Sequence, residues 1–267
     1  CFIIPPSPFL LDERVLPSLG ILKVAAALRS GGGPQDLRVL DLSGVKDVEQ
    51  ALDSFLGSFS GQAVCLTATS PQMPAARRII EHVRTFYPTL RIILGGPHPT
   101  LVNAAAKLEA KQARVGRAHR ALEVLFKFCD VVVAGDGEAA IFKALEPGTP
   151  EQLIDADDRK SPLFQTRDDY GASAFPARDL IDLRSYHYTI DGHPATSCIS
   201  QLGCPMNCQF CGGRNSAMLR VIRVRPVAKV IEEVELLYRT YGYTGFMCYD
   251  SQTDILTRDR GFIRFSD

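Results

Sequence analysis

The chain has 267 residues, 46% of them hydrophobic and 22% charged, which is typical of a soluble globular protein with one large domain or two ordinary ones. Its 30 basic side chains are balanced by 30 acidic ones, so we expect no nucleic acid partner and no binding to a membrane. No apolar run approaches the roughly 20 residues that cross a bilayer, and no signal peptide is recognisable, so we expect a cytoplasmic protein. Because the chain starts at Cys1 without methionine, we also expect that a leading segment is missing.

The first half of the chain alternates short apolar runs with segments of helical periodicity. We expect strands at residues 1–4, 37–42, 63–69, 91–94 and 131–134. We expect helices between and after them at residues 19–29, 45–59, 74–86, 101–128 and 138–145. All-apolar strands separated by helices indicate a parallel sheet that is covered on both faces. The sequence therefore predicts an α/β protein whose N-terminal domain, residues 1–147, is a doubly wound, Rossmann-like sheet of five strands.

The second half begins with a polar segment that contains several prolines, residues 148–189, which we interpret as a linker and lead-in to the next domain. Residues 190–267 then show a strand at 197–202, a helix opened by Pro226 and a further strand at 245–249. This alternation predicts a (β/α) barrel that is partial or truncated, because the chain has room for only about two strand–helix units.

Small, hydroxylated and glycine residues follow the strands of the first domain. Parallel sheets bind ligands at the carboxyl ends of their strands, where such residues let the backbone approach a flat or phosphorylated ligand closely. No Gly-x-Gly-x-x-Gly follows the first strand, so a dinucleotide is not expected, although each turn taken singly is also ordinary loop chemistry. The candidate ligand-binding residues are Ser43, Thr67, Thr69, Ser70, Gln72, Gly95, Gly96, Pro97, His98, Gly135, Asp136, Gly137 and Glu138.

Three of the eight cysteines, Cys204, Cys208 and Cys211, lie within eight residues. Thiolates suit iron, and a cubane cluster held by three cysteines leaves one iron open to a small molecule. The alternative is a zinc site completed by His187 or His193. The other five cysteines are scattered, most of them in apolar segments, and we expect most of them to behave as buried hydrophobic residues.

The spacing Cys-x3-Cys-x2-Cys, with Phe210 before the third cysteine, resembles the signature of the radical S-adenosylmethionine (SAM) enzymes. The resemblance implies a 4Fe-4S cluster on the three cysteines and SAM on its open iron. It implies SAM-binding roles for Phe210, Gly212, Gly213 and Asp250. Asp250 stands where many of these enzymes have the Glu of a Gly-Gly-Glu turn, and this sequence reads Cys-Tyr-Asp there.

Four arginines follow the cysteine loop. They predict a local positive field that steers the SAM carboxylate or balances the charge of the cluster, with a solvated basic face as the alternative. They are Arg214, Arg220, Arg223 and Arg225.

A wider order of motifs resembles the cobalamin-binding radical SAM enzymes: a proline-rich N-terminal loop, Gly-Gly-Pro-His-x-Thr at 95–100, Gly-Asp-Gly-Glu at 135–138, and then the cysteine loop. The resemblance implies that the first domain binds cobalamin through the turn residues given above, with the corrin facing the cluster. No Asp-x-His-x-x-Gly loop is present, which implies cobalt without a histidine ligand. Residues 69–73 are then the candidate cover of its lower face, and His98 is a weaker candidate.

In this family the cofactors carry the chemistry and the protein supplies placement and electrostatics. The resemblance implies a methyltransferase acting on an unactivated or weakly nucleophilic centre of a small metabolite or peptide, with an external electron donor. The branch that holds the tryptophan C2 methyltransferases is the one we name as most similar. Two alternatives stay open: a non-methylating rearrangement or cyclisation enzyme, and a non-catalytic cobalamin- or metal-binding module. No catalytic residue is assigned from the sequence.

Overall fold

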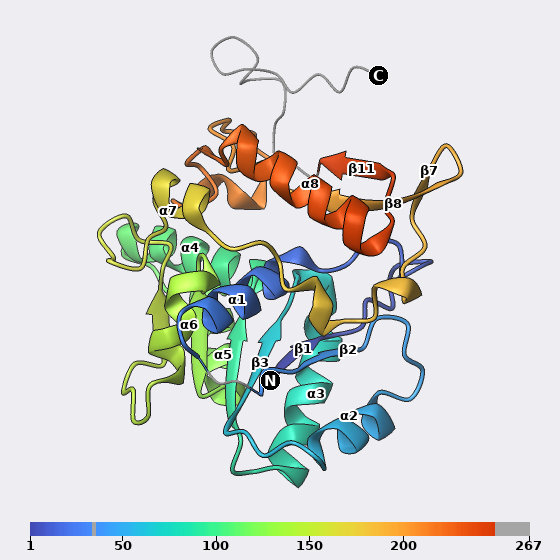
Figure 1. Cartoon of the computed structure of the whole chain (residues 1–267). Coiled ribbons are helices and arrows are strands. Elements are labelled where there is room, and N and C mark those ends of the chain that lie inside the picture. The colour runs from blue at the N-terminus through green and yellow to red at the C-terminus, as the bar shows by residue number, and fades with distance from the viewer. Residues whose placement is uncertain (34–35, 249–267) are drawn as a thin grey trace.

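The computed structural model describes residues 1–33 and 36–248, and its larger part is a six-stranded parallel sheet between two layers of helices (Figure 1). The strand order is β2-β1-β3-β4-β5-β6. The strands are β1 (Phe2–Ile4), β2 (Val39–Asp41), β3 (Ala63–Thr67), β4 (Arg91–Gly95), β5 (Val131–Ala134) and β6 (Leu153–Asp155). The order reverses between β1 and β3, and such a switch point is where open α/β sheets bind ligands.

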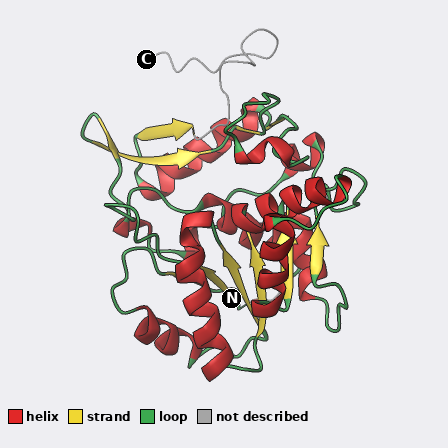
Figure 2. Ribbon diagram, turned by 180° about the vertical axis from the view of Figure 1, so that it is seen from behind, coloured by secondary structure: helices red, strands yellow, loops and turns green. Residues whose placement is uncertain are grey.

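Helices cover both faces of this sheet, as the view from behind in Figure 2 also shows. One apolar core lies under α2, α3, α4 and α5, and the other lies under α1 and α6. The helices are α1 (Leu19–Ser30), α2 (Val48–Leu56), α3 (Met73–Phe86), α4 (Pro97–Lys111), α5 (Arg117–Phe128) and α6 (Gly137–Leu145). The predicted α/β class and parallel sheet are therefore confirmed.

Two details of the predicted first domain are wrong. The sheet has six strands, because residues 153–155, predicted as linker, pair with β5 in parallel. This strand was missed because only two apolar residues, Leu153 and Ile154, mark it among polar neighbours. The single helix expected at 101–128 is two helices, because the chain turns between them and the carboxylate of Glu109 accepts hydrogen bonds from the backbone N–H groups of Gly116, Ala118 and His119 at the start of α5.

The C-terminal part contains one parallel strand–helix–strand unit. β8 (His193–Cys198) and β11 (Gly245–Cys248) pair in parallel and are joined through α8 (Val227–Tyr241), while β7 (Thr189–Ile190) pairs antiparallel with β8. The strand expected at 197–202 is divided, because β9 (Gln201–Leu202) leaves this sheet and pairs antiparallel with β10 (Arg223–Val224). A strand–helix–strand unit is what a (β/α) barrel repeats, and the barrel itself stays a prediction.

The C-terminal part lies across the carboxyl edge of the large sheet, with α8 on the far side from α2 and α3 (Figure 1). Between the two parts run α7 (Arg167–Ala172) and two short 3-10 helices, η2 (Arg178–Leu180) and η3 (Leu183–Ser185). Among the described residues, no helix combines the length and the apolar character that a transmembrane span requires.

Candidate functional site

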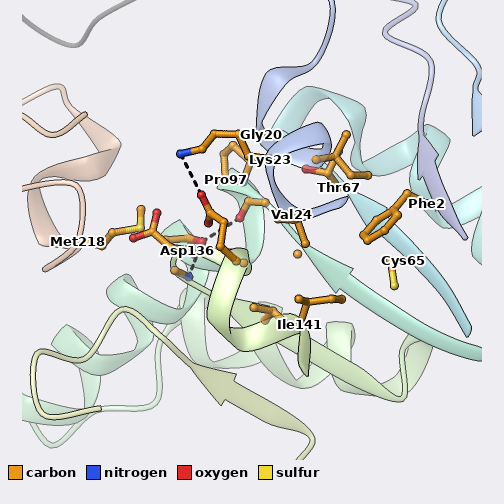
Figure 3. A pocket seen from close by; sticks show the side chains of 18 of the residues that line it. Phe2, Gly20, Lys23, Val24, Cys65, Thr67, Pro97, Asp136, Ile141 and Met218 are labelled. Carbon is orange, nitrogen blue, oxygen red and sulfur yellow. Dashed lines mark hydrogen bonds and ion pairs between the residues drawn. The ribbon is translucent and has the colours of Figure 1, made fainter. Parts of the chain in front are cut away.

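A cavity of about 300 Å³ lies at the carboxyl edge of the large sheet, closed on one side by the C-terminal part. Its inner end is apolar and is formed by Phe2 of β1, Cys65 of β3, Ile93 of β4, Val133 of β5 and Ile141 of α6 (Figure 3). Phe2 and Cys65 come from the two strands on either side of the switch point, β1 and β3. The position is the one at which open α/β sheets bind ligands, and the apolar lining suits a flat, weakly polar group.

Many of the residues predicted from the sequence line this cavity. They are Thr67, Gly95, Gly96, Pro97, Gly135, Asp136, Gly137 and Glu138. Gly96 and Gly135 have φ angles of +97° and +102°, which side chains rarely allow. A Cβ atom on Gly135 would lie 2.5 Å from the backbone of Ala156, and one on Gly96 would collide with the hydroxyl of Thr67. Both turns therefore keep bare backbone at the cavity wall.

The remaining predicted residues of the first domain are absent from the cavity wall and bind neighbouring loops. His98 Nδ1 lies 2.9 Å from the hydroxyl of Ser70, and burial lowers the pKa of His98. Gln72 donates to the backbone carbonyl of Pro5 at 3.0 Å, and it accepts from the backbone N–H of Thr69. Ser70 and Gln72 belong to η1 (Ser70–Gln72), Thr69 directly precedes it, and His98 contacts it from the start of α4. Ser43 lies further away, after β2, where its backbone carbonyl accepts a hydrogen bond from Arg14.

The cavity has a second set of lining residues, of which the sequence had singled out Arg223 alone. Helix α1 contributes Gly20, Ile21, Lys23 and Val24, and the C-terminal part contributes Ile199, Leu202, Met218, Leu219 and Arg223. Lys23 carried a usable signal that was missed, as the one charge in the otherwise apolar stretch 19–28. The others are ordinary residues, which the tertiary fold alone brings to the cavity.

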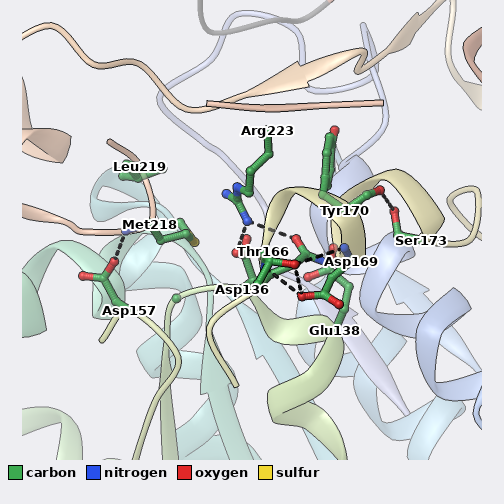
Figure 4. A network of polar contacts seen from close by, with 12 residues as sticks. Asp136, Glu138, Asp157, Thr166, Asp169, Tyr170, Ser173, Met218, Leu219 and Arg223 are labelled. Atoms are coloured by element: carbon green, nitrogen blue, oxygen red, sulfur yellow. Dashed lines mark hydrogen bonds and ion pairs between the residues drawn. The ribbon is translucent and has the colours of Figure 1, made fainter. Parts of the chain in front are cut away.

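Two ion pairs line the mouth of the cavity. Arg223, whose side chain is 1% exposed, pairs with Asp136 and donates to Gln165 Oε1 at 3.0 Å (Figure 4). Lys23 Nζ lies 3.1 Å from Glu138 Oε1 and 4.1 Å from the centre of the Tyr170 ring. Burial, and then the charge of Glu138, raise the pKa of Asp136 to about 6, against the opposing effect of Arg223. The mouth is therefore polar but its charges balance.

The predicted positive field of four arginines is wrong for two of them. Arg223 is buried against Asp136. Arg225 is buried against Glu233, whose carboxylate also binds Arg178 at 2.6 Å. Since a buried, paired arginine contributes little field outside the protein, neither residue is free to steer an anion. A sequence pattern does not show this, because Asp136 lies 87 positions before Arg223, and Glu233 lies eight positions after Arg225, beyond the three or four residues at which side chains pair along a helix.

The other two arginines bind the cysteine loop itself. Arg220 donates to the backbone carbonyls of Pro205 at 2.7 Å and Met206 at 2.8 Å, and Arg214 donates to that of Gln209 at 2.5 Å. The two guanidinium groups thus bind backbone carbonyls of the loop. In these hydrogen bonds neither arginine engages a cysteine thiol.

The cysteine loop runs from residue 204 to residue 211 and lies at the surface. Cys204 is half-buried, whereas Cys208 and Cys211 are exposed, and the ring of Phe210 is 93% exposed. In the part of the chain that the structure describes, no three His, Cys, Asp or Glu side chains stand close enough to hold a metal ion. The donor set fits an iron–sulfur cluster by its chemistry, three thiols on one accessible loop, and the loop would close further around it.

The other SAM-binding candidates lie at or beyond the end of this loop. Gly212 and Gly213 begin the short 3-10 helix η4 (Gly212–Asn215), which packs beside α4. Asp250 lies outside the described residues. His187 is one of the two histidines that could complete a zinc site in the alternative reading of the cysteine loop. Its Nε2 lies 2.6 Å from a carboxylate oxygen of Asp12, on the N-terminal loop.

The remaining cysteines differ in burial. Cys65, Cys129 and Cys198 are buried, as expected of small hydrophobic residues. Burial raises the pKa of the Cys65 thiol to about 11 and that of Cys129 to about 12, which makes both poor metal ligands. Cys1 is partly buried, and Cys248 is exposed with its sulfur 3.7 Å from that of Cys198, so these two do not follow the expectation fully.

Comparison with known proteins finds two enzymes of low sequence identity. The chain is 25% identical over 260 residues to an uncharacterised methyltransferase of Pyrococcus horikoshii, covering 90% of this chain and 50% of that protein. It is 23% identical over 216 residues to the anaerobic magnesium-protoporphyrin IX monomethyl ester cyclase of Cereibacter sphaeroides, covering 76% of this chain and 32% of that protein. No family model matches the chain. The chain thus spans half the length of the first relative and about a third of the length of the second.

Proposed function

We propose that this chain is part of a cobalamin-dependent radical SAM enzyme. The observation that carries the proposal is the closeness of two features: the segment that follows the cysteine loop contributes Met218, Leu219 and Arg223 to the wall of the cavity at the sheet edge. A three-thiol loop and a large, mostly apolar ligand cavity therefore adjoin each other. This is the arrangement that a reaction between two bound cofactors requires.

Each cofactor has residues of this chain that suit it. Cys204, Cys208 and Cys211 would hold a 4Fe-4S cluster, with Phe210, Gly212, Gly213 and Asp250 near SAM. The cavity residues after β3, β4 and β5 would hold the nucleotide end of cobalamin, whose flat base suits the apolar inner end of the cavity. When bound, these groups supply one-electron and methyl-transfer chemistry. The chain itself excludes water from the inner end of the cavity and keeps charge paired at its mouth.

For the reaction we propose methyl transfer to a small metabolite or peptide, with electrons from an external donor. The relative named as a methyltransferase, which matches nearly the whole chain, favours this reaction. The relative named as a cyclase favours the second candidate, a cyclisation without methyl transfer. The proposed location is the cytoplasm, where a reducing environment would keep the thiols of the loop available.

The experiment is anaerobic reconstitution of the protein with iron, sulfide and cobalamin, followed by metal analysis and by incubation with SAM and a strong reductant. Iron, sulfide and cobalt bound together, with release of S-adenosylhomocysteine, support the methyltransferase. Release of 5'-deoxyadenosine alone supports the cyclisation alternative. Bound cofactors without either product indicate a non-catalytic module, and zinc as the sole metal contradicts the proposal.

A further inference from the structure

Two buried carboxylates of the first domain hold the segment that follows the cysteine loop. Asp157, just after β6, is 2% exposed, and its Oδ1 accepts hydrogen bonds from the hydroxyl of Ser216 and the backbone N–H of Met218, both at 2.7 Å (Figure 4). Asp136, just after β5, holds the side chain of Arg223. Both ends of segment 216–223 are therefore fixed to the edge of the sheet.

The same segment holds the start of the cysteine loop. The backbone N–H of Cys204 donates to the carbonyl of Leu219 at 2.8 Å. Gly203 packs so closely against the backbone of Val221 that no side chain fits there. Arg220 binds two loop carbonyls, as described above, and Leu202 pairs with Arg223 in the β9–β10 ladder. Among the described residues, the hydrogen bonds given for loop 204–211 outside itself run to Arg214, Leu219 and Arg220, so the position of the loop depends on the segment that follows it.

The segment also forms one wall of the cavity, through Met218 and Leu219. A shift of this segment would therefore move the cysteine loop and the cavity wall together. Burial raises the pKa of Asp157, and the hydrogen bonds from Met218 and Ser216 oppose this effect. A buried carboxylate with two donors is a strong and geometrically defined anchor, because hydrogen bonds to a charged group are shorter and stronger than neutral ones.

We propose that Asp157 and Asp136 are positioning residues that set the cysteine loop against the cavity. The inference rests on the proposed function, in which the loop and the cavity hold the two reacting cofactors. Asp157 carries the clearer case, because its side chain binds the segment and does not line the cavity. Its loss leaves the residues of the cavity lining in place and loosens the segment that holds the loop and forms one cavity wall.

The test compares Asp157→Asn with Asp158→Asn, an exposed neighbour that holds only its own turn through the backbone N–H of Lys160. The reduced protein without cofactors is alkylated with iodoacetamide, and the rate at each loop cysteine is measured by mass spectrometry. We expect Cys204, the half-buried thiol, to react about tenfold faster in Asp157→Asn, the change that a loss of about 1.4 kcal/mol in a hydrogen bond to a charged group produces. Asp158→Asn should react at the wild-type rate.

A second measurement separates positioning from general destabilisation. Hydrogen exchange should quicken in residues 204–223 of Asp157→Asn but not in β3 and β4. Equal acceleration in both regions, or an unchanged Cys204 rate, overturns the inference. If Asp157→Asn does not fold, Ser216→Ala removes one of the two donors and should raise the Cys204 rate to a smaller extent, and an unchanged rate there overturns the inference too.

The outcome is distinguishable from failure of the proposed function. Thiol reactivity is measured without any cofactor, whereas the proposed function is tested by the iron and cobalt content of the wild type. If the wild type binds no iron but Cys204 still reacts faster in Asp157→Asn, the proposed function is wrong and the positioning role of Asp157 is supported. In the reconstituted protein, the electron paramagnetic resonance signal of the reduced cluster should change on addition of SAM in the wild type and in Asp158→Asn, and change less in Asp157→Asn.

Discussion

The guanidinium of Arg223, in the C-terminal part, forms a buried ion pair with the carboxylate of Asp136, which ends the turn after the fifth strand of the sheet. The two residues are 87 positions apart. Their contact joins the segment after the cysteine loop to the mouth of the cavity, and it replaces the solvent-facing role that the sequence suggested for Arg223.

Replacing Arg223 with Met should destabilise the fold by about 3–5 kcal/mol, because it leaves Asp136 buried beside Glu138 without its cation. Urea unfolding followed by circular dichroism measures this loss. The matched control is Arg184→Met, whose side chain is 97% exposed and should change stability by about 0.5 kcal/mol or less. Equal effects of the two substitutions would show that the buried pair does not join the two parts.

The stability of the protein should depend on pH through Asp136. Its pKa is about 6 in the folded protein, whereas an unfolded Asp has a pKa of about 4. Between these values the folded protein binds more protons than the unfolded chain, so the free energy of unfolding falls as pH rises from about 4 to about 6. At 1.36 kcal/mol per pKa unit the fall amounts to at most about 3 kcal/mol.

Asp136→Asn has no carboxyl group to titrate at this position. The free energy of unfolding of the wild type should therefore fall, relative to that of the variant, as the pH rises over that range. Urea titrations of both proteins at pH 4 and pH 7 give the two differences. A difference that is the same at both values would mean that Arg223 keeps Asp136 ionised throughout.

Alanine at Cys204, Cys208 or Cys211 should abolish the iron–sulfur absorbance of reconstituted protein, since two thiolates are too few to hold a cubane cluster. Alanine at Cys65 or Cys129 should leave the absorbance intact, because both thiols are buried and their raised pKa values disfavour the thiolate. Iron and sulfide content per chain provide the measurement. A requirement for Cys65 or Cys129 equal to that for the loop cysteines would make the assigned ligand set wrong.

Gly135→Ala should cost more stability than Gly148→Ala. Both glycines have a positive φ, which costs an alanine about 1–2 kcal/mol, but only Gly135 has backbone within 2.5 Å of the new Cβ, whereas Gly148 has open space around it. Thermal unfolding of the two variants isolates the effect of the close approach. Equal losses would indicate that the turn at the cavity wall can relax outward.

Bound cob(II)alamin should show no nitrogen splitting from a histidine in its electron paramagnetic resonance spectrum. His98 Nδ1 is engaged with Ser70, and His98 does not line the cavity. Each cobalt line is split into three by an axial nitrogen but not by an oxygen ligand or an open position. A triplet that disappears in His98→Ala would show that this histidine turns away from Ser70 and binds the cobalt.

The class of the first domain, and the turns at the carboxyl edge of its sheet, could be predicted from local patterns in the sequence. Short apolar strands alternating with helices are a local pattern, and so is a glycine-rich turn such as Gly95-Gly96-Pro97, so both can be recognised without knowing their neighbours. The same holds for the cysteine loop, whose three thiols lie within eight residues. The strand β6 was missed because its apolar run is only Leu153 and Ile154, between Gln152 and Asp155, in an otherwise polar stretch.

Which charges are free and which residues close the cavity depend on contacts that form in the folded protein. Arg223 and Arg225 look like a basic cluster beside the cysteine loop, yet their carboxylate partners are Asp136 and Glu233, which lie on other elements. Likewise, Asp157 lies in a segment predicted as a linker and becomes an anchor only because β6 brings it to the sheet edge. Burial and ion pairing depend on residues far apart in the chain, and a one-dimensional pattern carries no information about which of them meet.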